Sequence, residues 1–127
     1  MNAVDDIATV INDLTTGYVV QKDFFNDKDG FEEFIIIRSS GGSYASLLEG
    51  QAIEIAVIGS VASGRRPRDK IELIKTRLIG YNWLTLGTGI YQCDIVGGIM
   101  PFMMSDGRTG YTLNVIARYS RDEADRT

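Results

Sequence analysis

The chain has 127 residues, a length that predicts a single domain spanning residues 1–127 around one hydrophobic core. Hydrophobic residues make up 44% of the chain and charged residues 24%, a composition typical of globular domains and not of disordered segments. The formal net charge is −4, with no histidine and one cysteine, which excludes Ser–His and Cys–His catalytic pairs, thiolate zinc sites and an internal disulfide.

Neither membrane insertion nor export is expected. The longest uncharged stretch, residues 95–105, is far shorter than the roughly 20 apolar residues that a membrane-spanning helix needs. The acidic, amphipathic start lacks the basic residues and unbroken apolar run of a secretory signal. The single cysteine, Cys93, has apolar neighbours and is expected to be a small buried side chain, not a reactive thiol.

The first elements along the chain are one helix and two strands. Apolar residues at spacings of three and four predict an amphipathic helix over residues 3–15. Strands are predicted over residues 18–25 and 31–39, and the turn-forming cluster 26–30 predicts that they form a hairpin and not a calcium loop. The run 34–37 is apolar on both faces, so we expect a layer on each side of it: a helix on one side, with a neighbouring subunit as a candidate for the other.

Three more strands and a second helix follow. Residues 52–61 alternate as a strand, and residues 68–79 carry the apolar stripe of a helix. Residues 90–96 predict a fourth strand, and residues 111–119 show the clearest strand alternation of the chain. The residues that follow, 119–127, predict a flexible C-terminal tail.

The order of these elements predicts an α+β fold. The connections between successive strands are mostly too short for crossover helices, which favours a mainly antiparallel five-stranded sheet. The two helices are then expected to pack on one face of that sheet, giving two layers.

The charges are distributed unevenly. Residues 1–64 carry a net charge of −7 and residues 65–127 carry +3. Six basic residues fall close together: Arg65, Arg66, Arg68, Lys70, Lys75 and Arg77. This cluster is compatible with a solvated helix face, a subunit contact or a phosphate backbone, but the acidic chain as a whole disfavours nucleic-acid binding, and no sequence-specific nucleic acid is expected as a partner.

No pattern in the chain predicts catalysis, a metal or a cofactor. Residues 59–66 have the two glycines of a phosphate-binding loop, but Arg65 and Arg66 stand where the loop needs Lys and Ser or Thr. Paired carboxylates such as Asp5 and Asp6 lie in polar surroundings, where water keeps them ordinary surface groups. We therefore predict no catalytic, cofactor-binding or metal-ligating residues.

Two segments are candidates for contacts with a partner. One is the basic loop before the second helix, with Arg65, Arg66 and Arg68. The other is a methionine-rich stretch, residues 95–104, expected to be a loop and open to interpretation as contact surface or as core. Its candidate contact residues are Ile99, Met100, Phe102 and Met103. Opposite charge in the two halves favours head-to-tail association into a ring.

The element order and an arginine-bearing loop before the second helix resemble the tail terminator proteins of long-tailed bacteriophages, also called tail completion or minor capsid proteins. Residues 105–115, a polar glycine turn leading into an alternating strand, are similar to the last hairpin of that family. The resemblance covers residues 3–119 and rests on chain length, element order and the general pattern of residue types, without a diagnostic motif.

The resemblance implies a structural virion protein and not an enzyme. Such a protein forms a homo-oligomeric ring, usually of six subunits, that caps the tail tube, stops its polymerisation and offers a docking surface to the head connector protein. Its partners are its own copies, the tail-tube protein and the head connector. It is implied to sit at the head-proximal end of the virion tail after assembly in the host cytoplasm, with DNA passing through an acidic lumen.

The sequence is also compatible with other classes of protein function. A small-ligand-binding module would place Tyr81, Trp83 and Tyr91 around a pocket. An enzyme that runs on carboxylates alone would use Asp94 as a buried base, although an exposed position for Asp94 fits the strand pattern better. A non-viral oligomeric scaffold is a further alternative.

Overall fold

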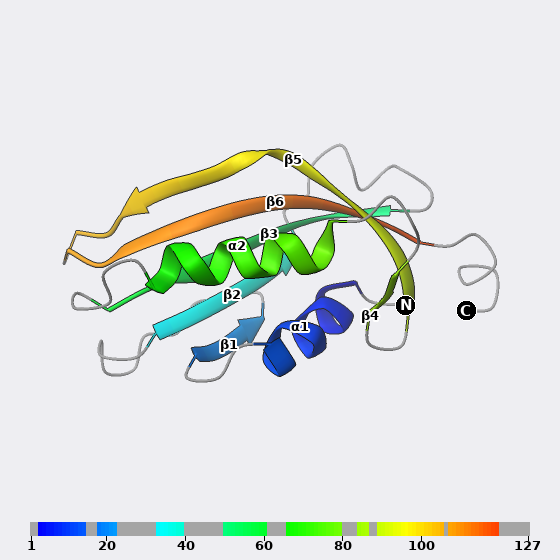
Figure 1. The fold of residues 1–127 in the computed structure, drawn as a ribbon, viewed down its shortest axis with the longest axis horizontal. Helices are drawn as coiled ribbons and strands as arrows, with labels where there is room; N and C mark the ends of the chain where they lie inside the picture. Colours follow the sequence, from blue (N-terminus) through cyan, green and yellow to red (C-terminus); the bar gives the residue numbers. More distant parts are fainter. Residues whose placement is uncertain are drawn as a thin grey trace.

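Two helices and six strands make up the part of the chain described by the computed structural model. The described residues are 3–14, 18–22, 33–39, 50–60, 66–79, 84–86, 89–105 and 107–119. The elements, in chain order, are α1 Ala3–Leu14, β1 Tyr18–Lys22, β2 Glu33–Ser39, β3 Gly50–Ile58, α2 Arg66–Leu78, β4 Leu84–Leu86, β5 Gly89–Met103 and β6 Thr109–Tyr119. The strands form one sheet in the order β1-β2-β3-β6-β5-β4 (Figure 1).

The predicted fold class is confirmed: the chain is α+β, with both helices packed on the same face of a mostly antiparallel sheet (Figure 1). The five expected strands are all present. A three-residue strand, β4, adds to the edge beside Gly89–Tyr91, and it is too short for its alternation to be visible in the sequence. The C-terminal tail predicted over 119–127 lies, beyond Tyr119, outside the described residues.

The predicted hairpin between the first two strands is wrong. β1 and β2 are parallel, with Tyr18 opposite Glu33 and Lys22 opposite Ile37. A tight turn cannot join two parallel neighbours, so β1 and β2 do not form a hairpin; residues 23–32 lie outside the described residues. The turn signal in 26–30 is local, whereas strand direction depends on which side chains reach the core. The parallel register turns Val20 toward α1 on the helix side.

The methionine-rich stretch predicted as a loop is also a strand. β5 continues to Met103, and only the segment between Val96 and Met100 departs from regular pairing with β6. Gly97, with a φ of 74°, accommodates this bulge, because residues with a side chain rarely adopt such a backbone conformation. Gly and Pro are general signals for loops, but here the glycines bend the strand without ending it.

A single large core lies between the sheet and the two helices, and we call it the helix-side core. It takes alternate residues of each long strand, which is why β6 shows such clear alternation in the sequence. Its fully buried side chains include Ile7, Ile11, Ile35, Ile37, Ile53, Ile55, Ile71, Ile74, Leu78, Tyr91 and Leu113. The helices contribute the apolar stripes that their spacing predicts.

The opposite side of the sheet, here called the second face, carries a smaller cluster of buried residues: Phe34, Ile36, Ala56 and Ile58. The prediction that the β2 run is buried on both faces is confirmed, since Phe34 to Ile37 are all buried. Phe102 and Met104, from the far end of the β5–β6 hairpin, pack against this cluster. The side chains that pack against the second face of β2 in the described residues therefore come from the same chain.

Candidate interaction surface

The basic candidates lie at the start of α2. Pro67 occupies the first turn, where a missing N–H costs no helical hydrogen bond, and the buried face of the helix holds it on the sheet. Arg66 forms an ion pair with Glu33 of β2, at 3.1 Å. Arg68 pairs with Glu72 one turn later, at 3.2 Å. Arg65, the third predicted contact, lies outside the described residues.

These arginines already have partners within the chain, which changes what they offer to another protein. Both side chains of the Arg68–Glu72 pair are about half exposed, so water screens this pair and it contributes at most about 1 kcal/mol to stability. Glu33 is only 12% exposed, so its pair with Arg66 is screened less. Arg68 also lies over the Tyr111 ring, 5.6 Å from its centroid. A partner carboxylate could compete for Arg68 at a small cost in folding stability.

The methionine-rich candidates lie on the distal part of β5, residues 95–103, which we call the β5 arm. Met100 and Met103 are exposed, at 59% and 73% of their surface. Ile99 is half-buried against the helix-side core, and Phe102 is half-buried on the second face. The structure thus separates the four predicted contact residues into two exposed methionines and two side chains that pack within the chain.

Phe102 fills a space that a glycine leaves on the neighbouring strand. Gly110 stands opposite Phe102, and a Cβ built there would lie 2.3 Å from the Phe102 ring and 2.8 Å from the Val57 carbonyl oxygen. Glycine is therefore required at this position by close packing. The Phe102 side chain stands at one end of a row of paired residues that crosses the second face: Val19, Phe34, Ile58, Gly110 and Phe102.

The tip of the arm is the hairpin that the sequence predicts. Met104 donates its backbone N–H to the Arg108 carbonyl at 2.8 Å, and Gly107 donates to the Met104 carbonyl at 3.0 Å. Gly107 has a φ of 92°, which suits glycine in a turn. The Arg108 side chain is only 3% exposed, an unusual location for a charged group.

The two predicted contact segments are neighbours in space. Tyr111, beneath Arg68, is the strand partner of Pro101 in the arm. A basic group of α2 therefore lies near Pro101 on the helix side of the arm, the side to which Met103 also points, whereas Met100 points to the second face. Sequence spacing alone could not show this, since about thirty residues separate the two segments.

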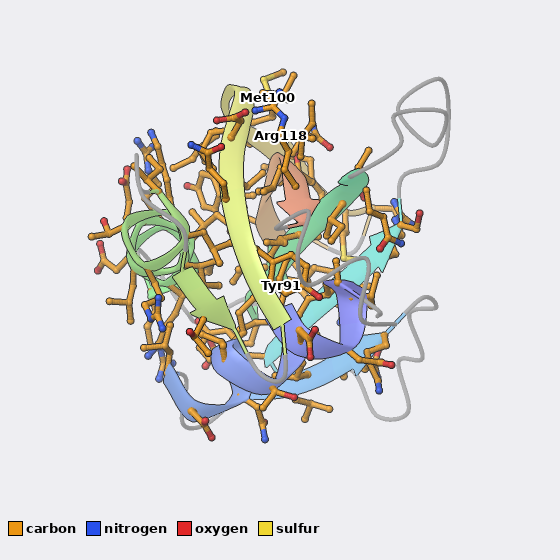
Figure 2. All side chains as sticks on the ribbon, turned by 90° about the vertical axis from the view of Figure 1, so that its right-hand side faces the viewer. Tyr91, Met100 and Arg118 are labelled. Atoms are coloured by element: carbon orange, nitrogen blue, oxygen red, sulfur yellow. The ribbon has the colours of Figure 1, made fainter. Side chains whose placement is uncertain are left out.

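The prediction that Asp6 is an ordinary surface group is wrong, because Asp6 takes part in a buried polar contact between α1 and β5. The Tyr91 hydroxyl donates a hydrogen bond to the Asp6 carboxylate, and both residues are buried. Figure 2 shows Tyr91 low on β5 beside α1, with Met100 at the top of the view. The sequence offered only a weak signal: Asp6 adjoins the apolar stripe of its helix. Tyr91 is thus a core residue and does not line an open pocket.

Two other ionisable groups are shifted by burial. Cys93 is buried as expected, and burial raises the pKa of its thiol to about 11. Burial, followed by the neighbouring Glu33 carboxylate, raises the pKa of the Tyr18 phenol. Both shifts favour the protonated form, so at neutral pH Cys93 is a poor nucleophile.

The alternatives based on small-molecule chemistry find little support in the described residues. Asp94 is paired with Arg118 on the second face, and its side chain is 44% exposed, so it is not a buried base. The described part of the chain contains no group of three His, Cys, Asp or Glu side chains placed to hold a metal ion. Tyr81 and Trp83 lie outside the described residues.

An open hollow on the second face was not predicted from the sequence. It lies where the hairpin end meets the middle of the sheet and is lined by Ile36, Arg38, Glu54, Ala56, Ile58, Phe102 and Thr112. Arg38 and Glu54 form an ion pair along its rim.

Among the described helices, none is long and apolar enough to cross a membrane.

Comparison with known families decides between the remaining classes. A family model described as phage tail termination protein matches residues 1–121. The chain belongs to this family. Tail termination proteins are structural components of the phage tail, which agrees with the resemblance found in the sequence and gives the protein a place in the virion tail. No curated protein matches the chain significantly.

Proposed function

We propose that this tail termination protein assembles as a ring of identical subunits, usually six, that caps the finished tail tube. The ring stops further polymerisation of tube subunits and presents a docking surface to the head connector at the head-proximal end of the tail. The observation that carries the proposal is the family match across residues 1–121, nearly the whole chain. Assembly takes place in the host cytoplasm, and the protein acts without catalysis.

The surface of the chain is consistent with such a role. Met100 and Met103 are large apolar side chains exposed on opposite faces of one edge strand. Exposed methionines suit a contact surface because their flexible, polarisable side chains adapt to a partner. Arg68 adds a positive charge over Tyr111 on the helix side of the arm, and Arg65, Arg66, Ile99 and Phe102 complete the proposed contact region.

Terminator activity can be tested by tube length. Tail-tube subunits of the same phage are polymerised with and without the protein, and lengths are measured by negative-stain electron microscopy. We expect shorter tubes, each with extra density at one end. Unchanged lengths with bare ends would refute the capping role.

The role of the basic residues can be tested separately. Arg66→Gln and Arg68→Gln should each weaken assembly several-fold. Stability should fall by no more than about 1 kcal/mol for Arg68, whose pair with Glu72 is about half exposed, and by more for Arg66, whose partner Glu33 is only 12% exposed. Lys75→Gln, on the last turn of the same helix, is the matched control for loss of one positive charge. Equal assembly of the Arg variants and the wild-type chain would remove these residues from the interface.

A further inference from the structure

The outer edge of the β5 arm has the features of an edge strand that can pair with a strand of another chain. β4 pairs only with Gly89–Tyr91, and Ile79 forms a single bridge with Cys93. Within the described residues, no strand pairs with this edge from Asp94 to Met103 (Figure 1). Ten residues of strand are about 30 Å long, so the edge is long for a sheet of this size.

The backbone of the arm presents hydrogen-bonding groups outward. Met104 bonds to Arg108 across the hairpin, and the direction of backbone groups alternates along a strand. Phe102 and Met100 therefore bond to β6, while Met103 and Pro101 point away from it. Pro101 lies where its missing N–H costs no bond within the sheet. The outward groups at these positions are the Met103 N–H and C=O and the Pro101 C=O.

In the described part of the chain this strand lacks lysine and a covering strand, two of the usual protections against edge pairing, although it contains a bulge and a proline, which are two others. Soluble proteins block exposed edges with lysine, with inward-pointing charges or with a covering element. β5 contains no lysine or arginine, and its single charge, Asp94, is paired with Arg118. Instead, Val96, Met100 and Met103 are exposed along the arm. The strand continues through the bulge and Pro101 to Met103, so neither of them shortens the edge that is available for pairing.

The opposite end of the same sheet has an outer strand of its own. β1 is the first strand in the sheet order and has β2 as its strand partner. Val19 of β1 is 38% exposed and stands on the second face, level with Phe34. Met100 and Val96 are exposed on that same face at the other end of the sheet. Both edges thus carry apolar side chains on the same face.

Strand directions make the two edges compatible. β1 runs parallel to β2, and the three following pairs, to β3, β6 and β5, are antiparallel. β1 and β5 of one chain therefore run in opposite directions. Rotation about an axis along the strands preserves each direction, so β1 of the next copy meets β5 antiparallel, the more favourable arrangement. The contact uses two different edges, so it generates a ring when the rotation between subunits closes, and not a two-fold dimer.

We propose that the β5 arm of one subunit pairs antiparallel with β1 of a second copy of this chain, so that the sheets join edge to edge around the ring. This inference rests on the proposed ring and specifies its contact. Val19 of one copy continues the apolar row that ends at Phe102 of the other. Pairing of β5 with itself is the competing arrangement; it would give a dimer and leave β1 unused.

Cross-linking tests the pairing directly. The variant with both Val19→Cys and Met100→Cys is treated with a short bismaleimide, which tolerates a register offset of two residues, about 7 Å. We expect a ladder of covalent oligomers from this variant and none from either single variant. A mixture of the two single variants should give hetero-dimers. The wild-type chain is the control for Cys93, which is buried.

Each other outcome overturns a defined part of the account. Dimers from Met100→Cys alone would establish β5–β5 pairing. Rings visible in negative stain without any cross-link would refute the edge contact and leave the ring itself intact. Failure of the wild-type chain to form rings, alone or on tubes, would instead refute the proposed function.

A backbone test separates strand pairing from side-chain contact. Met103→Pro removes the outward N–H, whereas Met103→Ala keeps it and removes the exposed side chain. We expect the Pro variant to raise the concentration needed for assembly at least ten-fold and the Ala variant to raise it much less. Equal effects would contradict pairing through the backbone. If the Pro variant fails to fold, Met103→Lys, which puts an edge-blocking charge at an exposed site, takes its place with the same expected loss.

Discussion

The two halves of β5 lie in opposite environments. In the proximal half, Tyr91 and Cys93 are buried, and Tyr91 is bonded to Asp6 of α1. In the distal half, beyond the bulge at Val96, Met100 and Met103 are exposed along an edge without a strand partner among the described residues. One strand thus stabilises the fold at one end and offers a contact surface at the other. Changes in the first half should affect stability, and changes in the second should affect assembly.

The largest loss of stability is expected in the helix-side core, to which the proximal half belongs. Ile55 is fully buried between Ile37 and Leu113 on the neighbouring strands. Ile55→Ala removes packed methylene groups and leaves a cavity, so the free energy of unfolding should fall by about 2–5 kcal/mol. Urea denaturation followed by circular dichroism measures it. A loss under about 1 kcal/mol would mean that this core is not closely packed.

A smaller loss is expected from the hydrogen bond of the proximal half. Tyr91→Phe keeps the ring but removes the donor to the buried Asp6 carboxylate, which should cost about 1–3 kcal/mol. Tyr111→Phe, a half-buried tyrosine on β6, is the matched control and should change stability by less than about 0.5 kcal/mol. Equal effects of the two variants would show that the Tyr91 bond contributes nothing specific.

The buried thiol predicts a third, pH-dependent effect. The pKa of the Cys93 thiol is raised in the folded state to about 11. The contribution of this thiol to the free energy of unfolding is therefore fully present below the unfolded pKa near 9 and is lost as the pH rises toward 11. At pH 10 the loss should be roughly 1 kcal/mol. Denaturation at pH 8 and pH 10 should show a smaller decrease for Cys93→Ala than for the wild-type chain. Identical decreases would assign the pH dependence to other groups, with the Tyr18 phenol the first candidate.

The smallest effect on folding is expected in the distal half. Met103→Lys alters a side chain that is 73% exposed, so the free energy of unfolding should change by less than about 0.5 kcal/mol. A thermal melt compared with that of the wild-type chain checks this value. A loss of several kcal/mol would show that the arm is part of the folding core, and the contrast between the halves of β5 would disappear.

The sequence predicts those parts of the fold that depend on local periodicity. The stripes of both helices and the alternation of β6 follow from single faces packed against one core. The direction of β1 relative to β2 does not, because it depends on the path of a connection and on distant packing. The distal half of β5 was missed for a related reason: Gly97 and Pro101 are compatible with a loop and with a bulged edge strand alike.

The candidate surface could be predicted only in part. An abundance of methionine near the last hairpin was visible in the sequence, but not that Met100 is exposed while Phe102 packs over Gly110. The basic cluster was visible as well, but not the ion pair between Arg66 and Glu33, which joins α2 to β2. Side-chain pairs of this kind arise from tertiary packing and leave no spacing signal in the chain.

The state of assembly tests the account most directly. Mass measured by light scattering over a wide range of protein concentration, with and without tail-tube subunits, should reveal a closed oligomer of defined size. Met103→Lys should shift that oligomer to monomer at concentrations where the wild-type chain is assembled, with an unchanged thermal melt. A wild-type chain that stays monomeric at every concentration, both alone and on tubes, would contradict the account.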